Sequence, residues 1–286
     1  MPVRDDLGTR MKEFYEQVPK FRLYRRTPVA IRIDGKAFHT FTRGFQKPFD
    51  EILIKSMQDT MKYLCENIQG CVLGYTQSDE ITLILVDYKK LNSDAWFDYE
   101  IQKICSIAAS MATMAFNKYF AEEVTSYIVK NDERIKIGYP KAWVLAEKSK
   151  DLTNYDTTLI KAMEKGAMFD ARCFNIPREE VTNLIYWRQL DATRNSIQMV
   201  GQANFSHKEL QNKSCNDIQD MLMLQKGINW NDFPTHQKRG SCCIKNHDYD
   251  EYGVDWGEGW RIDTEIPIFK GEDRKYIEKL IQPDEE

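Results

Sequence analysis

The sequence lacks several features that mark special classes of protein. Its seven cysteines include no Cys-x-x-Cys pair, and their odd number suits reduced thiols, so we expect no structural disulfides. No apolar run is long enough to span a bilayer, because the most apolar stretch, residues 104–116, is short and interrupted by Ser and Thr. We therefore expect a cytoplasmic protein with no secretory signal and no membrane partner.

Glycine and proline are also scarce, with 14 and 9 residues in a chain of 286. Hydrophobic residues make up 42% and charged residues 29% of the chain, which excludes collagen-like and low-complexity classes. A chain of this length can bury a substantial core and forms one large domain or two small ones.

An overall positive charge is missing as well. The formal net charge is −4, which counts against a nucleic-acid partner. The charge is uneven, however, because the last 41 residues hold 13 acidic and 5 basic side chains, whereas residues 10–47 hold 10 basic and 3 acidic ones. This basic segment fits either a solvated face or a phosphate-binding surface, and charge counting leaves both open.

Apolar periodicity in the first part of the chain predicts the order β-α-β-β-α-β. The predicted strands are residues 29–33, 71–75, 81–86 and 167–174, and the predicted helices are residues 53–68 and 97–120. This order is typical of the ferredoxin-like α+β fold, in which two helices cover one face of an antiparallel sheet. We expect one unit over 1–175 and a helical and β extension over 176–286, packed together compactly.

The pattern beyond residue 175 is less regular. It predicts helices over residues 179–200, 214–225 and 272–281, and strands over 239–245 and 265–269. Glycines 253, 257 and 259 follow no apolar strand and stand among acidic residues, so we expect an acidic surface loop there.

Carboxylates stand at two predicted strand ends. Asp34 ends the first strand, and Asp79 and Glu80 occupy the hairpin between the second and third. Acidic groups at the ends of apolar strands are costly unless a cation or hydrogen bonds compensate them, and Mg²⁺ prefers such oxygen ligands. Ordinary turn residues would give the same spacing, so spacing alone does not decide.

The residues after Asp34 favour a phosphate site. A Gly35 turn is followed by cationic side chains (Lys36, His39, Arg43 and Lys47). Backbone N–H groups at a turn and flanking cations together suit a triphosphate. Metal-binding carboxylates beside such a loop indicate nucleotidyl or phosphoryl transfer.

Six strings in order, RIDGKAFHTF, KPFD, GYTQSDE, FDAR, WRQLDATRN and KRGS, resemble the tRNA-histidine guanylyltransferase family, whose members add nucleotides to tRNA in the 3′-to-5′ direction. The resemblance covers nearly the whole chain and implies a polymerase-palm catalytic domain, agreeing with the predicted strand order. It also implies tRNA and nucleoside triphosphates, including ATP and GTP, as substrates, two Mg²⁺ ions as cofactors and a homotetramer.

The resemblance implies roles for individual residues around the two acids. Asp34 and Asp79 would bind both Mg²⁺ ions, with the Gly35 carbonyl as a further ligand and Glu80 as an acidic neighbour needed for activity. The triphosphate would lie against a short segment and two nearby residues, namely Lys36, Ala37, Phe38, His39, Lys47 and Ser78.

Other residues are implied as contacts for a second phosphate or the RNA end, namely Arg32, Arg188, Asn195, Lys238 and Arg239. On the predicted helix that contains Trp187, however, Arg188 and Asp191 are three residues apart and Asp191 and Asn195 four. Such neighbours can equally form an internal network, so both interpretations stand.

One position favours a particular branch of the family. Thr193 stands where the eukaryotic histidine-specific enzymes carry His, which resembles the Thg1-like-protein branch that repairs truncated tRNA 5′ ends by templated addition. Addition of G at position −1 of tRNA-His is the alternative. A nucleotidyl cyclase and a non-catalytic tRNA-binding protein explain fewer of the motifs, and a zinc site from His236, Cys242, Cys243 and His247 matches no common spacing.

Overall fold

The computed structural model describes the chain apart from residues 1–4, 131–139, 142–143, 145–151, 250–254 and 284–286. Its centre is a six-stranded antiparallel sheet with the strand order β4-β1-β3-β2-β5-β6. The strands are β1 (Val29–Gly35), β2 (Cys71–Gln77), β3 (Glu80–Leu85), β4 (Phe169–Asn175), β5 (Ser241–Tyr249) and β6 (Asp255–Asp263). The fold is α+β, as predicted.

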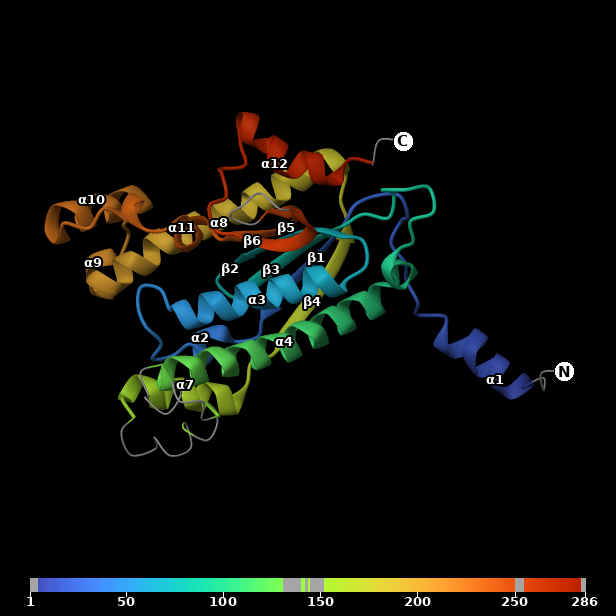
Figure 1. The fold of residues 1–286 in the computed structure, drawn as a ribbon, viewed down its shortest axis with the longest axis horizontal. Coiled ribbons are helices and arrows are strands. Elements are labelled where there is room, and N and C mark those ends of the chain that lie inside the picture. The colour runs from blue at the N-terminus through green and yellow to red at the C-terminus, as the bar shows by residue number, and fades with distance from the viewer. Residues whose placement is uncertain (1–4, 131–139, 142–143, 145–151, 250–254, 284–286) are drawn as a thin grey trace.

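Helices surround this sheet on both sides (Figure 1). The longer ones are α3 (Glu51–Asn67), α4 (Ile101–Val129), α7 (Asn154–Lys165), α8 (Arg178–Asn204) and α10 (Cys215–Lys226). Short helical segments are α1 (Asp6–Met11), η1 (Lys12–Glu16), α2 (Phe38–Phe41), η2 (Trp96–Tyr99), α9 (His207–Leu210), η4 (Trp230–Asp232), α11 (Thr235–Arg239), η5 (Gly271–Arg274), α12 (Lys275–Glu278) and η6 (Lys279–Ile281).

The predicted β-α-β-β-α-β order is confirmed by β1, α3, β2, β3, α4 and β4. Strands β5 and β6 extend the same sheet beyond β2, with Tyr75 opposite Cys242. No described helix is long and apolar enough to cross a membrane.

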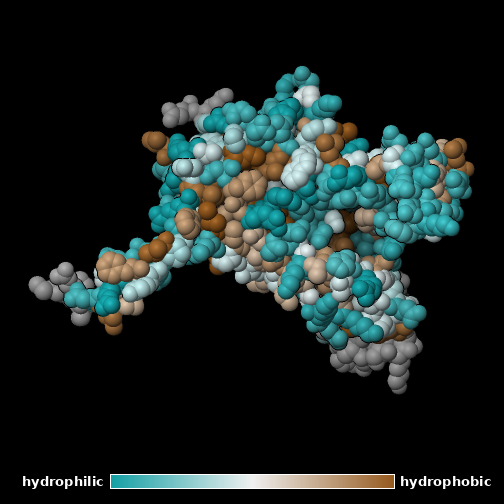
Figure 2. Space-filling model, turned by 180° about the vertical axis from the view of Figure 1, so that it is seen from behind, coloured by the Kyte–Doolittle hydropathy of each residue, from teal (hydrophilic) through white to brown (hydrophobic). Residues whose placement is uncertain are grey.

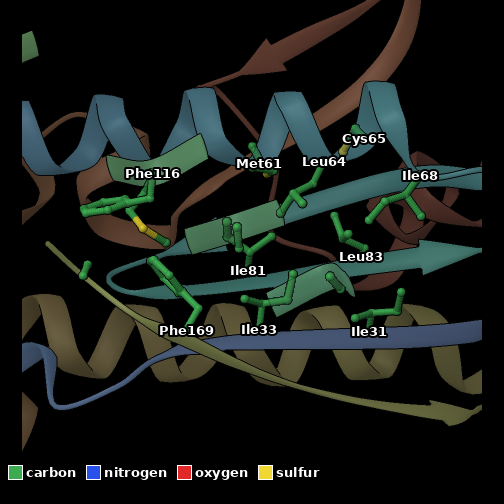
Figure 3. Close-up of a cluster of buried hydrophobic side chains, with 14 of the residues drawn as sticks. Ile31, Ile33, Met61, Leu64, Cys65, Ile68, Ile81, Leu83, Phe116 and Phe169 are labelled. Atoms are coloured by element: carbon green, nitrogen blue, oxygen red, sulfur yellow. The ribbon is translucent and has the colours of Figure 1, made fainter. Parts of the chain in front are cut away.

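Side chains of β1 alternate between two apolar cores because successive residues of a strand point to opposite faces. Ile31 and Ile33 pack with Met61 of α3 and Phe116 of α4 (Figure 3). On the other face, Ala30 packs in a second cluster that includes Val181 and Ile185 of α8 as well as residues of α12 and η6. Even-numbered residues of β1 therefore face α8.

Three predictions for the second half were wrong. Residues 265–269 form no strand. Gly257 and Gly259 lie within β6 instead of a loop, because β6 gains a ladder of hydrogen bonds with β5. The predicted helix over 272–281 is divided into η5, α12 and η6. Helix α7 was missed, although Thr153 and Asp156 form a capping box at its start.

The first described residues form an N-terminal arm (residues 5–21) that extends from the body of the molecule (Figure 1). Large apolar side chains of the arm are exposed at roughly helical spacing, and Figure 2 shows them as brown and tan atoms along it. They are Leu7, Met11, Phe14, Tyr15, Val18 and Phe21.

Candidate active site

Asp34 and Asp79 lie together at one end of the sheet, as the predicted strand order requires. Asp34 is paired across the sheet with Glu80 on one side and Asp170 on the other. The backbone N–H of Gly35 donates to the Asp79 carbonyl oxygen at 3.1 Å, which joins the end of β1 to the β2–β3 hairpin. The side chains of both aspartates are partly buried.

The environment disfavours negative charge on both aspartates. Burial raises the pKa of Asp34, and the neighbouring carboxylates of Glu80 and Asp170 raise it further. Burial also raises the pKa of Asp79, against a 3.0 Å hydrogen bond from the Ser78 hydroxyl. Among the described residues, no Lys or Arg forms an ion pair with either aspartate.

This arrangement fits a bound Mg²⁺. A cation would relieve the repulsion between the carboxylates, and their hard oxygens are the donors that Mg²⁺ prefers. The described side chains contain no group of three or more His, Cys, Asp and Glu residues able to enclose a metal. The chain therefore offers Asp34 and Asp79, while carbonyl, phosphate and water oxygens would supply the other ligands.

Glu80 has a different environment from the two aspartates. Its Oε2 atom lies 2.5 Å from Arg32 Nη2, and its Oε1 atom lies 2.6 Å from Arg188 Nε. Arg188 also contacts Asp191 at 2.9 Å, so the predicted internal pair on α8 is present. Two arginines thus neutralise the buried Glu80, which links the hairpin, β1 and α8.

The turn after β1 provides backbone donors. Gly35 is required there, because a Cβ at this position would lie 2.1 Å from the Phe38 ring. Ala37 adopts the left-handed conformation. Within the described part of the chain, no group accepts from the backbone N–H of Ala37, Phe38 or His39. These N–H groups can therefore bind an anion.

The side chains of this turn divide into two sets. Lys36 and His39 are exposed, as is Lys47 further along the chain. Phe38 is buried against Phe41, Phe116 and Phe169, so it offers a ligand only its backbone. Ser78 is exposed at the hairpin, with its hydroxyl turned to Asp79.

A pocket adjoins the other side of this hairpin. Its lining includes Gln77 and Ser78 of the hairpin, Asn195 of α8 and His236 of α11. The Asn195 amide donates to Asp191 at 3.4 Å, so it belongs both to the pocket wall and to the charged network.

The two cations of the KRGS string have different surroundings. The Lys238 ammonium donates to the Asn231 carbonyl at 2.5 Å and lies 5.7 Å from the centre of the Trp230 ring. Burial lowers the pKa of Lys238, and the adjacent Arg239 adds to this shift. Lys238 is thus held inside the fold, whereas the Arg239 side chain is partly exposed.

Sequence reasoning missed the contribution of β4. Asp170 stands opposite Asp34 and Arg172 stands opposite Arg32. Both belong to the FDAR string, but the string does not reveal that β4 pairs with β1. The strand order of the predicted fold was the available signal, because it places these strands side by side.

Together, the fold and the site are typical of a nucleotidyltransferase, with carboxylates at a sheet end beside a turn whose N–H groups have no acceptor in the described chain. A sequence profile of the tRNAHis guanylyltransferase family matches residues 8–177. The chain therefore belongs to this family, whose members are nucleotidyltransferases acting on tRNA.

Individual proteins agree with this assignment. A bacterial tRNA(His) guanylyltransferase (Thg1)-like protein in complex with ATP is 40% identical, with a TM-score of 0.73, and the match covers 96% of this chain and 99% of that one. A bacterial Thg1-like protein in complex with GTP is 37% identical, with a TM-score of 0.71 and the same coverage. The tRNA(His) guanylyltransferase of Saccharomyces cerevisiae is 26% identical over 231 residues, which cover 76% of this chain and 82% of that protein.

Proposed function

We propose that this protein is a Mg²⁺-dependent 3′-to-5′ nucleotidyltransferase that repairs the 5′ end of tRNA by templated addition. The observation that carries the proposal is the juxtaposition of Asp34 and Asp79, which have no ion-pair partner among the described residues, with the N–H groups of the β1–α2 turn that have no acceptor there. The ATP and GTP complexes of Thg1-like proteins support nucleoside triphosphates as substrates.

In this mechanism, the 5′-monophosphate of the tRNA attacks the α-phosphate of a nucleoside triphosphate, and pyrophosphate leaves. The 3′-hydroxyl of an incoming nucleotide then attacks the activated 5′ phosphate, and the nucleoside monophosphate leaves. Asp34 and Asp79 would hold Mg²⁺, with the Gly35 carbonyl as a further ligand. Bound there, Mg²⁺ would lower the pKa of the attacking hydroxyl and neutralise charge on the departing phosphates.

The chain's own groups position the triphosphate. The N–H groups of residues 37–39 would bind phosphate oxygens, and Lys36 and Lys47 would balance the remaining charge. These donors are fixed before the substrate arrives, because Phe38 is anchored in the core. Catalysis then depends on alignment and charge neutralisation, as is usual for transfer at phosphorus.

Thr193 supports templated repair over addition of G to tRNA-His. Its hydroxyl donates to the Gln189 carbonyl at 2.9 Å within α8, and its short side chain cannot make the contacts of an imidazole. We propose that pairing with the opposite acceptor strand chooses the added nucleotide. The name of the Saccharomyces cerevisiae relative, a tRNA(His) guanylyltransferase, fits the alternative, in which G is added at position −1.

Primer extension on tRNAs truncated at the 5′ end tests this proposal. Each of the four nucleoside triphosphates is supplied singly with ATP and Mg²⁺, on tRNAs that differ only in the base opposite the missing position. We expect the added nucleotide to follow that base. Addition of G regardless of the opposing base would contradict templated repair and establish the alternative.

We propose further that the protein is a cytoplasmic homotetramer in which the N-terminal arm contacts another copy. Six large side chains of the arm are 41–70% exposed, and aromatic residues and Met of this kind are enriched in protein interfaces. Such a surface rarely remains in contact with water.

Charge placed on the arm tests this contact. We expect the double substitution Phe14→Glu and Val18→Glu to lower the molar mass measured by light scattering, because burying two carboxylates in an apolar contact is costly. The matched control is Lys12→Glu, which changes charge at an exposed polar position of the same arm. An unchanged mass in the double variant would contradict an arm-mediated assembly.

A further inference from the structure

Trp187 is unusual among the tryptophans of the described chain. Trp96 and Trp230 are buried, and the Trp230 indole donates to the Ser196 hydroxyl at 3.0 Å. Trp187 is instead 52% exposed on α8. No described residue accepts a hydrogen bond from its indole N–H. Exposing a large aromatic ring to water is costly, so such a ring is typical of a binding surface.

Two arginines hold the Trp187 ring in place. The guanidinium carbons of Arg188 and Arg32 lie 4.6 and 5.4 Å from the ring centre. Both arginines are fixed by Glu80, so the ring rests on a charged network that is already ordered. An exposed ring that is fixed in this way loses little conformational entropy when a ligand stacks on it.

The ring lies over the same sheet face as the candidate active site. Arg32 and Asp34 are two residues apart on β1 and therefore share the face toward α8, about 7 Å from each other. A flat group stacked on Trp187 would consequently lie within roughly one nucleotide of the Asp34 carboxylate. Arg32 also has a buried Nε–H group with no acceptor in the described chain. Buried donors are usually paired, so a polar ligand would supply the acceptor that is missing here.

The surroundings of Trp187 are apolar and cationic. Leu190 and Arg194 are exposed on α8 at three and seven residues beyond the tryptophan, on the same helix face. Arg172 of β4, opposite Arg32, is more than half exposed. A half-exposed aromatic ring flanked by arginines is the pattern by which proteins stack bases of RNA and contact adjoining phosphates.

We infer that Trp187, with Leu190 and the flanking Arg172 and Arg194, forms a platform. On this platform, the 5′-terminal base of the tRNA acceptor stem stacks beside Asp34. A free nucleotide would suit this surface less well, because mononucleotide bases usually enter an enclosed pocket. The inference rests on the proposed function and assigns the surface that positions the RNA end for it.

The test uses an acceptor-stem RNA that carries 2-aminopurine at its 5′-terminal position. We expect its fluorescence to be quenched by the wild-type protein and by Trp187→Phe, and not by Trp187→Leu. We also expect Trp187→Leu to bind the RNA about 5- to 100-fold more weakly, corresponding to loss of one stacked base. The Michaelis constant for ATP should remain within about 2-fold of the wild-type value, since the groups proposed to bind the triphosphate lie in the β1–α2 turn and not on α8.

A control separates RNA contact from a structural role. Tyr127→Leu removes an exposed aromatic ring from α4, on the opposite side of the sheet, and should leave quenching unchanged. Equal quenching and affinity in wild-type and Trp187→Leu proteins would overturn the platform. So would a fall in thermal stability of Trp187→Leu with unaltered RNA affinity.

The proposed function and the platform fail in distinguishable ways. A wild-type protein that quenches the terminal base but adds no nucleotide would overturn the proposed function and support the platform. Normal addition by Trp187→Leu, with an unchanged Michaelis constant for tRNA, would overturn the platform and support the function.

Discussion

We expect Asp34→Asn to abolish Mg²⁺-dependent nucleotide addition while tRNA binding persists, and this is the largest effect that we expect. The substitution keeps the size of the side chain and removes one of the two carboxylates available for Mg²⁺. Metal stabilisation of a phosphoryl transition state amounts to several kcal/mol, so we expect a loss of at least about 10³-fold. Asp79→Asn should have a comparable effect in the same assay.

Asp170→Asn is the matched control for this prediction. Asp170 lies directly opposite Asp34, but it is exposed and paired with Arg172 at 3.1 Å. We expect it to retain addition within about 10-fold of the wild-type rate. Near-normal addition by Asp34→Asn would remove the metal assignment from this end of the sheet.

The raised pKa of Asp34 adds a readout that does not depend on activity. A carboxyl whose pKa is higher in the folded than in the unfolded chain binds protons more tightly when folded. Stability therefore falls as the pH rises from the ordinary aspartate value through the raised one, and the ionised group destabilises the metal-free protein at neutral pH. We expect Asp34→Asn to melt at a higher temperature without Mg²⁺, and Mg²⁺ to stabilise the wild type more than the variant.

Arg188→Ala should produce the largest loss of stability. It would leave the buried Glu80 with Arg32 as its remaining arginine partner and would weaken the link between α8 and the hairpin. Removing one partner of a buried ion pair costs about 3–5 kcal/mol, which urea unfolding would measure. Arg188→Lys should recover only part of this loss, because lysine cannot reproduce the fork of contacts to Glu80 and Asp191.

An exposed pair on the same sheet face provides the comparison. Arg172 and Asp170 are both more than half exposed, so Arg172→Ala should change the free energy of unfolding by less than about 1 kcal/mol. If Arg188→Ala unfolded at the same urea concentration as Arg172→Ala, the network around Glu80 would not be a structural element.

Local patterns were sufficient to predict the strands and helices that build the first part of the fold. The apolar run over residues 81–86 is buried on both faces, so its sequence is strongly constrained. The adjacency of Asp34 and Asp79 then follows from strand order alone. The proximity of Arg188 to Glu80 does not, because 108 residues separate them and their meeting depends on how α8 packs.

The wrong predictions share a physical origin. In β6, Gly257 and Gly259 have low strand propensity, but pairing with β5 supplies the hydrogen bonds that the local sequence does not encode. Helix α7 was not predicted, yet Thr153 and Asp156 are the signature of a helix start. Tertiary pairing and capping thus outweighed composition.

The Phe38 ring has a mechanical consequence for the phosphate turn. It packs on Gly35 at one end and on Phe116 and Phe169 at the other, so this ring joins the turn to the apolar core, in addition to the backbone hydrogen bonds of the turn. Loosening that core would shift the N–H groups that are proposed to bind the phosphates, even if no residue in contact with the phosphates had been substituted. We therefore expect substitutions deep in the core to change the turnover rate of the enzyme before they unfold it.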